Sequence, residues 1–264
     1  YLTTSGADIH LTFIGDEAKI KEQLANYQIP ADKFNIVHTT QVIEMNEHPT
    51  KALKEKPQSS IAIGFQLLAT GKTDAFISAG NTGAMMVGSL FSIKAIDGVL
   101  RPAIGAYMPR EDGSLGLLVD VGLNADCKPE NLNQFATLGS LYAQHILNFE
   151  NPRVGLINLG EEEGKGNLLT QATYPLLKEN KLINFIGNIE GRDILTTRAD
   201  VFVCNGYTGN VVLKLAESIY DITKRRNIND EHFNRFNFEQ YGGVPVLGVA
   251  KPVIIGHGIS HALA

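Results

Sequence analysis

Short apolar runs alternate along the chain with longer segments in which apolar residues recur every three or four positions. The short runs are rich in valine, isoleucine and phenylalanine and are bounded by glycine, asparagine or aspartate, which is typical of β-strands. The runs predicted as strands are Ile9–Ile14, Asn35–Thr39, Asp74–Ser78, Ala103–Met108, Leu115–Val121, Val154–Leu159, Asn184–Ile189, Val201–Cys204, Val244–Val249 and Val253–Ile255.

The segments with helical spacing begin at residues that favour helix N-termini. Asp16 precedes Ile20 and Leu24, Ser59 or Ser60 can cap the helix that Gly71 ends, and Pro129 fits a first turn. The remaining predicted helices are Thr82–Ala95, Leu168–Leu177, the segment after Cys204 with Val211, Val212, Leu215, Ile219 and Ile222 on one face, and the start of a helix in His257–Ala264.

The alternation of strands and helices predicts an α/β fold with a mainly parallel sheet between two helical layers. We expect residues 1–264 to form a single α/β domain. The chain begins at Tyr1 rather than at a methionine, so we expect its N-terminal start to be missing. An amphipathic helix changes abruptly into polar sequence at Lys224–Asp230, which indicates an incomplete helical insertion near residues 220–238.

The composition narrows the class of protein. The 264 residues carry 23 Lys and Arg against 28 Asp and Glu, a net charge of −5, so nucleic acid is not expected as the main partner. No run of apolar residues is long enough to span a membrane, and because no signal-like segment opens the sequence, we do not expect secretion. The two cysteines cannot form a disulfide framework, which favours a cytoplasmic protein.

Glycine-rich polar loops follow six of the predicted strands. Their glycines allow backbone N–H groups to approach a ligand, and the following helix N-termini add partial positive charge, a combination suited to an oxyanion such as phosphate. In a parallel sheet, ligands bind beyond the carboxyl ends of the strands. The loops are Ala79–Gly83, Gly122–Lys128, Gly160–Asn167, Glu190–Asp193, Asn205–Asn210 and Gly256–Ser260. Each loop alone could be a capped turn; together they favour a binding site.

The standard motifs of nucleotide and metal sites are missing from these loops. Gly160–Gly166 has the wrong glycine spacing for a P-loop, and no strand is followed by a dinucleotide-binding glycine fingerprint. Neither a paired-histidine zinc helix nor a nucleophile elbow occurs. The carboxylates Glu161–Glu163 could hold a metal, but solvent or a Lys or Arg partner is favoured, and no metal or cofactor is expected.

Read in order, the loops resemble those of the phosphate acyltransferases of bacterial phospholipid synthesis. The resemblance extends from about Glu44 to the end of the chain and rests on unusual motifs in the same order. These are DAFISAGNTGA, RPAIG, DVGLNADCKPENL, NPRVGLINLGEEEGKGN, NFIGNIEGRD, VCNGYTGNVVLK and YGGVPVLGV. Two features of that family are absent: a glycine-rich acidic loop (Asp-Ala-Met-Gly-Gly-Asp) after the first strand, and a longer helical insertion before the Tyr-Gly-Gly segment.

The resemblance implies transfer of a long acyl chain from acyl carrier protein to inorganic phosphate, giving acyl phosphate for glycerophospholipid synthesis. It also implies a homodimer, a fold related to phosphate acetyltransferase and isocitrate dehydrogenase, and a reaction without a cofactor. The helix Tyr207–Arg226 could contact a membrane surface, which would make the cytoplasmic protein peripheral at the inner face of the membrane.

Residue types in the loops suggest roles in this chemistry. We predict catalytic roles for Asn81, Asn124, Lys165 and His257, the last as an acid for the leaving sulfur. The predicted residues for binding phosphate or substrate are Ser78, Gly80, Thr82, Gly83, Lys128, Asn167, Arg192, Gly209 and Asn210. The alternatives are structural: the asparagines and His257 would be turn residues, and Lys165 would pair with Glu161–Glu163. Cys127, beside Lys128, is favoured as structural.

An acidic carrier protein would need a basic patch, for which Lys224–Arg226, Arg101 and Arg110 are candidates. Three rival functions stay open at the level of sequence. They are a short-chain phosphate acetyltransferase using acetyl-coenzyme A, a nicotinamide-dependent dehydrogenase of the related fold, and a non-enzymatic sensor of phosphate or nucleotide.

Overall fold

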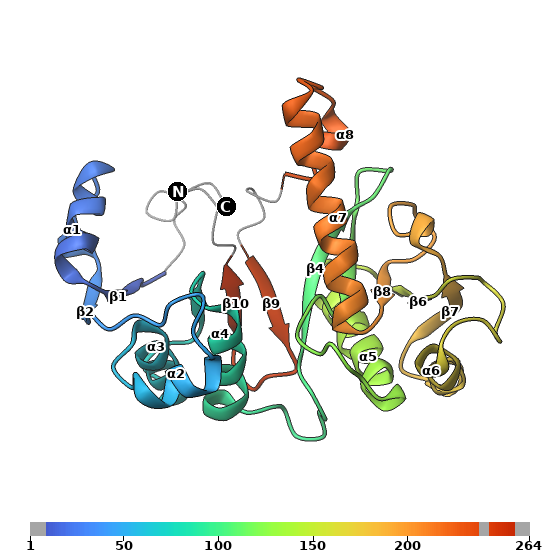
Figure 1. Ribbon diagram of the computed structural model, residues 1–264, viewed down its shortest axis with the longest axis horizontal. Helices are drawn as coiled ribbons and strands as arrows, with labels where there is room; N and C mark the ends of the chain where they lie inside the picture. Colours follow the sequence, from blue (N-terminus) through green and yellow to red (C-terminus); the bar gives the residue numbers. More distant parts are fainter. Residues whose placement is uncertain (1–8, 238–242, 257–264) are drawn as a thin grey trace. The chain divides into compact units, whose positions relative to one another are not determined.

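The computed structural model describes residues 9–237 and 243–256, and it divides into two compact units, Tyr1–Ile93 and Lys94–Ala264 (Figure 1). Each unit combines strands and helices, so the α/β class predicted from sequence is confirmed. The expectation that residues 1–264 act as one domain stays a prediction about how the two units behave together.

The first unit contains a pair of parallel strands and several short helices. Strand β1 (Thr12–Gly15) pairs in parallel with β2 (Asn35–His38). The other elements are α1 (Glu17–Asn26), η1 (Ala31–Lys33), α2 (Pro49–Glu55), α3 (Ser60–Ala69), β3 (Phe76–Ser78), α4 (Thr82–Gly88) and the π-helical turn η2 (Ser89–Ile93). The predicted caps are confirmed: Asp16 accepts from the backbone N–H of Ala18, and Ser59 Oγ from that of Ala62.

The core of the first unit is built around Phe65 of α3, which is 1% exposed. Its ring meets that of Phe76 edge to face, with centroids 5.0 Å apart. A Cβ at Gly88 would lie 2.1 Å from the Phe65 ring, so α4 can approach α3 only because that position is glycine. The core therefore holds the end of α4 against α3, and α4 begins within the predicted loop Ala79–Gly83.

The second unit is a sheet with its strands in the order β10-β9-β4-β5-β8-β6-β7. The strands are β4 (Ala103–Pro109), β5 (Leu115–Val119), β6 (Arg153–Ile157), β7 (Asn184–Ile189), β8 (Val201–Val203), β9 (Gly243–Leu247) and β10 (Val253–Gly256). The helices are α5 (Pro129–His145), α6 (Leu168–Glu179), η3 (Gly191–Asp193), α7 (Gly206–Arg225) and α8 (Glu231–Asn234).

The sheet is parallel from β5 through β8 and β6 to β7, and antiparallel from β10 to β5. Alternate residues of the parallel strands pack under α5 and α6, where Leu132 and Phe135 of α5 are 0% exposed. Burying a leucine or phenylalanine side chain is worth roughly 1.5–3 kcal/mol, so this layer is the main source of stability for the second unit.

Two details differ from the sequence-based expectation. Helix α2 was not predicted, because its seven residues bury only Ala52 and show no apolar period. The predicted helix Thr82–Ala95 ends earlier, where α4 passes into the π-helical turn at Ser89. The predicted helix start in His257–Ala264 lies outside the described residues.

Candidate functional site

Four of the glycine-rich loops lie at one edge of the sheet in the second unit. The parallel register pairs Val119 of β5 with Val203 of β8, Leu156 of β6 with Val203, and Ile157 of β6 with Ile189 of β7. The loops that follow these strands therefore leave the sheet side by side at its carboxyl edge. This is the arrangement predicted for the loops that begin near residues 120, 158, 190 and 204.

Asp120 is the centre of the first loop and is fully buried. Its carboxylate accepts from the backbone N–H groups of Ile104 (2.9 Å) and Asn124 (2.6 Å), and from the Asn124 side chain (3.0 Å). Burial raises the pKa of Asp120, although these hydrogen bonds favour the charged form. The carboxylate thus ties the loop to β4 through amide donors and without an ion pair among the described residues.

The N-terminus of α7 packs directly onto this loop. A Cβ at Gly209 would lie 1.8 Å from the carbonyl oxygen of Asp120, and a Cβ at Gly206 would lie 2.8 Å from its Oδ2. Asn205 caps α7 by accepting from the N–H of Thr208 at 3.1 Å, and its amide reaches the carbonyl of Ala125 at 3.1 Å. The predicted residue Gly209 is therefore needed for the close approach of helix and loop.

The other predicted residues of this region hold the backbone or face solvent. Asn124 donates to the carbonyl of Pro102 at 2.9 Å and is 8% exposed. The Asn210 amide donates to the carbonyl of Val121 at 3.3 Å. Lys128 is exposed at the N-cap of α5. Burial raises the pKa of the Cys127 thiol to about 11, which argues for the structural role predicted for it.

The loop after β6 has its backbone held by amide side chains. Asn158 Nδ2 donates to the carbonyl of Lys165 at 3.0 Å, and Asn188 Nδ2 donates to the carbonyl of Glu162 at 2.9 Å. Gly166 has a φ of +101°, and a Cβ there would lie 2.0 Å from Thr170 Oγ1. The predicted residue Asn167 caps α6 through the N–H of Thr170 at 2.9 Å.

Two acidic side chains of this loop form ion pairs with residues outside it, whereas its lysine does not. Glu161 forms an ion pair with Arg198, and Glu163 pairs with Lys178 at 3.1 Å. Lys165 is exposed and forms no ion pair with any residue that the structure describes. The alternative in which Lys165 is neutralised by Glu161–Glu163 is thus disfavoured. Arg192 pairs with Glu190 at 2.6 Å and keeps 75% of its side chain exposed.

The predicted loop Ala79–Gly83 lies in the first unit and is held by Asn81. Asn81 caps α4 by accepting from the N–H of Ala84 at 2.9 Å, and its Nδ2 lies within 3.2 Å of the carbonyls of Glu44, Met45 and Glu47. Asn81 is 4% exposed, so its amide fastens the loop to the segment before α2. A direct catalytic role for Asn81 stays a prediction.

The neighbours of Asn81 differ in exposure. Ser78 Oγ accepts from the N–H of Gly80 at 3.1 Å, and Thr82 is exposed. A Cβ at Gly83 would lie 2.4 Å from Pro49 Cγ, which brings α2 and α4 together. His257, predicted as the acid, lies outside the described residues.

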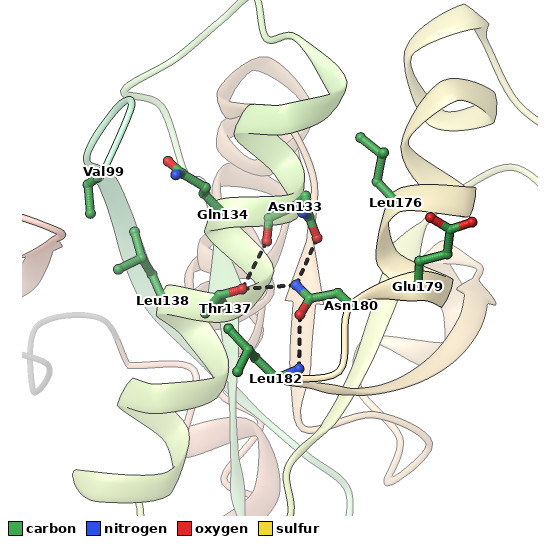
Figure 2. Close-up of a pocket in the computed structure, with 9 residues that line it drawn as sticks. All are labelled: Val99, Asn133, Gln134, Thr137, Leu138, Leu176, Glu179, Asn180 and Leu182. Carbon is green, nitrogen blue, oxygen red and sulfur yellow. Dashed lines mark hydrogen bonds between the residues drawn. The ribbon is translucent and has the colours of Figure 1, made fainter. Parts of the chain in front are cut away.

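A cavity of about 490 Å³ lies between α5 and α6 (Figure 2). Polar side chains that line the cavity form hydrogen bonds with one another: Asn180 Nδ2 donates to Asn133 Oδ1 at 2.8 Å and to Thr137 Oγ1 at 3.1 Å. Gln134 fastens the segment before β4 by accepting from the N–H of Leu100 at 2.7 Å. None of the predicted site residues lines this cavity.

The opposite edge of the sheet carries a different polar cluster. Asp200, just before β8, accepts from Arg110 at 2.6 Å and from Arg153 at 2.9 Å. Burial by itself would raise the pKa of Asp200, but hydrogen bonds from Arg153 and Arg110 outweigh it and lower that pKa. The proposal that Arg110 belongs to a surface basic patch is wrong, because its side chain is 3% exposed.

Sequence reasoning missed three residues that shape the candidate site: Asp120, Asn158 and Asn188. Asp120 lies inside the predicted strand Leu115–Val121, where its neighbours Val119 and Val121 are apolar. The amides of Asn158 and Asn188 sit at strand ends, where an amide among apolar neighbours was an available signal. Asn188 is 2% exposed, and its Oδ1 has no hydrogen-bond partner among the described residues, an arrangement that costs about 1–3 kcal/mol.

Comparisons with known proteins agree with one another. The sequence profile of the family described as fatty acid synthesis protein matches residues 2–229. A phosphate acyltransferase of Halothermothrix orenii is 44% identical over 277 residues, which cover 97% of this chain and 83% of the relative. A phosphate acyltransferase of Chlorobaculum tepidum is 44% identical over 289 residues, which cover 100% and 87%.

Solved structures place the fold. The EutD phosphotransacetylase from Staphylococcus aureus superimposes with a TM-score of 0.63 at 17% identity, covering 98% of this chain and 84% of that one. A 4-hydroxythreonine-4-phosphate dehydrogenase from Klebsiella pneumoniae gives 0.53 at 11% identity, covering 96% and 81%. The predicted relation to the folds of phosphate acetyltransferase and of a dehydrogenase is therefore confirmed. At these low sequence identities the similarity shows the fold alone.

Proposed function

Because this chain belongs to the fatty acid synthesis protein family, whose curated relatives are phosphate acyltransferases, we propose that it transfers a long-chain acyl group from acyl carrier protein to inorganic phosphate. The protein is an acyltransferase enzyme. The names of these relatives favour phosphate acyl transfer over the rival acetyltransferase function. The rival function is supported only by the similarity of the fold to that of a phosphotransacetylase at low sequence identity.

The observation that carries the site is the parallel register, which places the loops after β5, β8, β6 and β7 at one edge of the sheet. There Lys165 and Arg192 are exposed, and Lys165 has no ion pair among the described residues. These two cations would attract phosphate, and Lys128, exposed at the start of α5, lies in another loop of the same edge. We assign substrate contacts to these three residues and the holding of the loops to Asn124 and Asn81.

The reaction needs no covalent enzyme intermediate. A phosphate oxygen attacks the thioester carbon, the carbon–sulfur bond breaks, and the carrier thiol leaves as a thiolate that then takes up a proton. Holding the two reactants together can lower the barrier by about 7–11 kcal/mol, and one well-placed donor to the oxyanion adds about 3–4 kcal/mol. A thiolate of pKa about 8.5 leaves with little help from an acid, so the predicted role of His257 is secondary.

The cysteines are poor candidates for a nucleophile. Burial and the nearby Asp120 raise the pKa of Cys127 to about 11, and burial raises that of Cys204 well above its ordinary value. A thiol that stays protonated reacts slowly with a thioester. Direct attack by phosphate is therefore the simpler course.

We also propose how the enzyme meets its partners. Tyr207, Val211 and Leu215 of α7 are exposed and follow one another at intervals of four, so they form one apolar stripe. This stripe supports a homodimer or a peripheral membrane contact for a cytoplasmic enzyme. Among the described residues, no helix is both long and apolar enough to cross a membrane. For the acidic carrier, Lys224–Arg226 and Arg101 are the proposed basic contacts.

The direct test is to incubate the purified protein with palmitoyl–acyl carrier protein and inorganic phosphate. We expect free carrier thiol and trapped acyl phosphate to appear in equal amounts, and neither to appear without phosphate. A parallel reaction with acetyl-coenzyme A should give little acetyl phosphate. Acetyl phosphate as the main product would move the assignment to the rival acetyltransferase, and the absence of both products would overturn the proposed function.

A further inference from the structure

The backbone around Lys165 is held from several directions. Its N–H donates to the carbonyl of Glu162 at 3.0 Å, and its own carbonyl accepts from Asn158 Nδ2 at 3.0 Å. The orientation of the Asn158 amide is fixed, because its Oδ1 accepts from the N–H of Leu159 at 2.9 Å. Lys165 thus has both of its backbone polar groups engaged.

Two further amides complete the arrangement. Asn188 Nδ2 donates at 2.9 Å to the same Glu162 carbonyl that the Lys165 N–H uses. Gln171 of α6 donates from Nε2 to the carbonyls of Gly164 and Gly166, each at 3.0 Å. The residues on both sides of Lys165 are therefore fastened to β6, β7 and α6 by Asn158, Asn188 and Gln171, which we call the amide clamp.

The chemistry of the clamp matters as much as its geometry. Amide side chains carry no net charge, so they hold the loop without neutralising the lysine. Of the three acidic neighbours, Glu161 and Glu163 are already paired with Arg198 and Lys178, and Glu162 forms no ion pair with Lys165 or with any other described residue. A loop exposed to solvent does not require a buried amide such as Asn188 for its own stability. Among the described residues of this loop, Lys165 is the cation without an ion pair, and the clamp fixes its backbone.

We propose that Asn158, Asn188 and Gln171 are positioning residues that act through Lys165, by fixing its backbone so that its ammonium group meets the phosphate. This inference rests on the proposed function for the reaction and goes beyond it in assigning these three residues. It predicts that the clamp contributes to phosphate use only when the lysine is present.

The test is a double-mutant cycle on the full-length protein. Gln171 is exposed, so Gln171→Met removes the donor while keeping the length of the side chain and adding no charge beside the lysine, and Lys165→Met removes the ammonium group. Kinetics with varied inorganic phosphate and a fixed palmitoyl–acyl carrier protein concentration give kcat and KM for each variant. Gln134→Met, at the cavity between α5 and α6, is the matched control, because it also loses two amide hydrogen bonds, to Leu100 and Gly98, away from the loop.

We expect Gln171→Met to lower kcat/KM for phosphate about tenfold in the natural sequence and less than twofold in the Lys165→Met background. Gln171→Asn, which keeps a shorter amide, should recover part of the loss. An equal loss in both backgrounds would overturn the proposal, because it would show a general structural role. Turnover by the unaltered protein separates this failure from failure of the proposed function.

A second measurement does not depend on turnover. Amide hydrogen exchange at Gly164–Asn167 should be faster in Gln171→Met and in Asn158→Asp than in the unaltered protein, and unchanged in Gln134→Met. Unchanged exchange in both clamp variants would also overturn the proposal.

Discussion

Two buried aspartates lie at opposite edges of the same parallel strands and are stabilised in opposite ways. Asp200, at the amino edge, is held by Arg110 and Arg153, which lower its pKa. Asp120, at the carboxyl edge, is held by amide donors alone, and burial raises its pKa. The amino edge is therefore closed by internal ion pairs, while at the carboxyl edge the cations, Lys165 among them, form no ion pair with Asp120 among the described residues.

The greatest loss of stability is expected when the ion pairs of Asp200 at the amino edge are removed. Asp200→Ala leaves Arg110 buried without its carboxylate, and loss of one partner of a buried pair costs about 3–5 kcal/mol. Urea unfolding should show this loss in the free energy of unfolding. Asp112→Ala, which removes an exposed carboxylate near the same end of β4, is the control, and a similar small change in both variants would contradict the importance of the ion pairs.

The next effect breaks the carboxyl edge. Gly209→Ala adds a Cβ that would lie 1.8 Å from the carbonyl oxygen of Asp120, so α7 or the loop must shift. Such overpacking costs about 1–3 kcal/mol, and it should lower kcat more than Asp200→Ala does in whatever fraction is folded. Gly191→Ala, whose Cβ would meet nothing within 4 Å, is the matched control. Unchanged turnover in Gly209→Ala would separate this packing from the reaction.

The contributions of Asp120 and Asp200 to the free energy of unfolding should depend on pH in opposite directions. A carboxyl with a raised folded pKa stabilises the fold most below its ordinary value of 3.8, and this contribution is lost as the pH rises through the folded pKa. The carboxyl of Asp200, with a lowered folded pKa, stabilises the fold above 3.8, and this contribution is lost as the pH falls through the folded pKa.

The measurement is urea unfolding of the unaltered protein, Asp120→Asn and Asp200→Asn between pH 3 and pH 7. As the pH falls, the stability advantage of the unaltered protein should grow over Asp120→Asn and shrink over Asp200→Asn. The same direction of change for both variants would refute the assigned environments.

The smallest effect is expected at Cys127, which lies beside the carboxyl edge and for which we predict a structural role. Cys127→Ser keeps a donor for the carbonyl of Asn124, now 3.4 Å from Sγ, and should change the unfolding free energy by less than about 1 kcal/mol. Turnover should be nearly unchanged. Because the pKa of Cys127 is about 11, its alkylation by iodoacetamide should be slow at pH 8 and rise with pH, as mass spectrometry would show.

Much of the fold could be predicted from sequence, because its signals are local. Asp16 and Ser59 are the predicted N-caps of α1 and α3, and the apolar runs at Val154 and Val201 form the predicted strands. Helix α2 could not be predicted, since a single buried residue gives no period. The strand predicted to reach Val121 ends at Val119, because Asp120 turns its carboxylate to β4.

The site was predictable as a set of loops but not as a set of contacts. The Asn81 amide meets carbonyls more than thirty residues away, and Asn124 meets that of Pro102, so their holding roles depend on tertiary structure that no local pattern contains. Lys165 could be named from its loop, while its freedom from Glu161 and Glu163 depends on the distant partners Arg198 and Lys178.

We propose that cations at the carboxyl edge, Lys165 first, bind phosphate during the transfer. The most direct measurement compares kcat/KM for phosphate in Lys165→Met with that in Lys178→Met, a lysine exposed beside the same loop and paired with Glu163. We predict a loss of about a hundredfold or more for Lys165→Met, as for removal of one transition-state contact, and little change for Lys178→Met, with melting temperatures alike. Equal activity in the two variants would contradict the account.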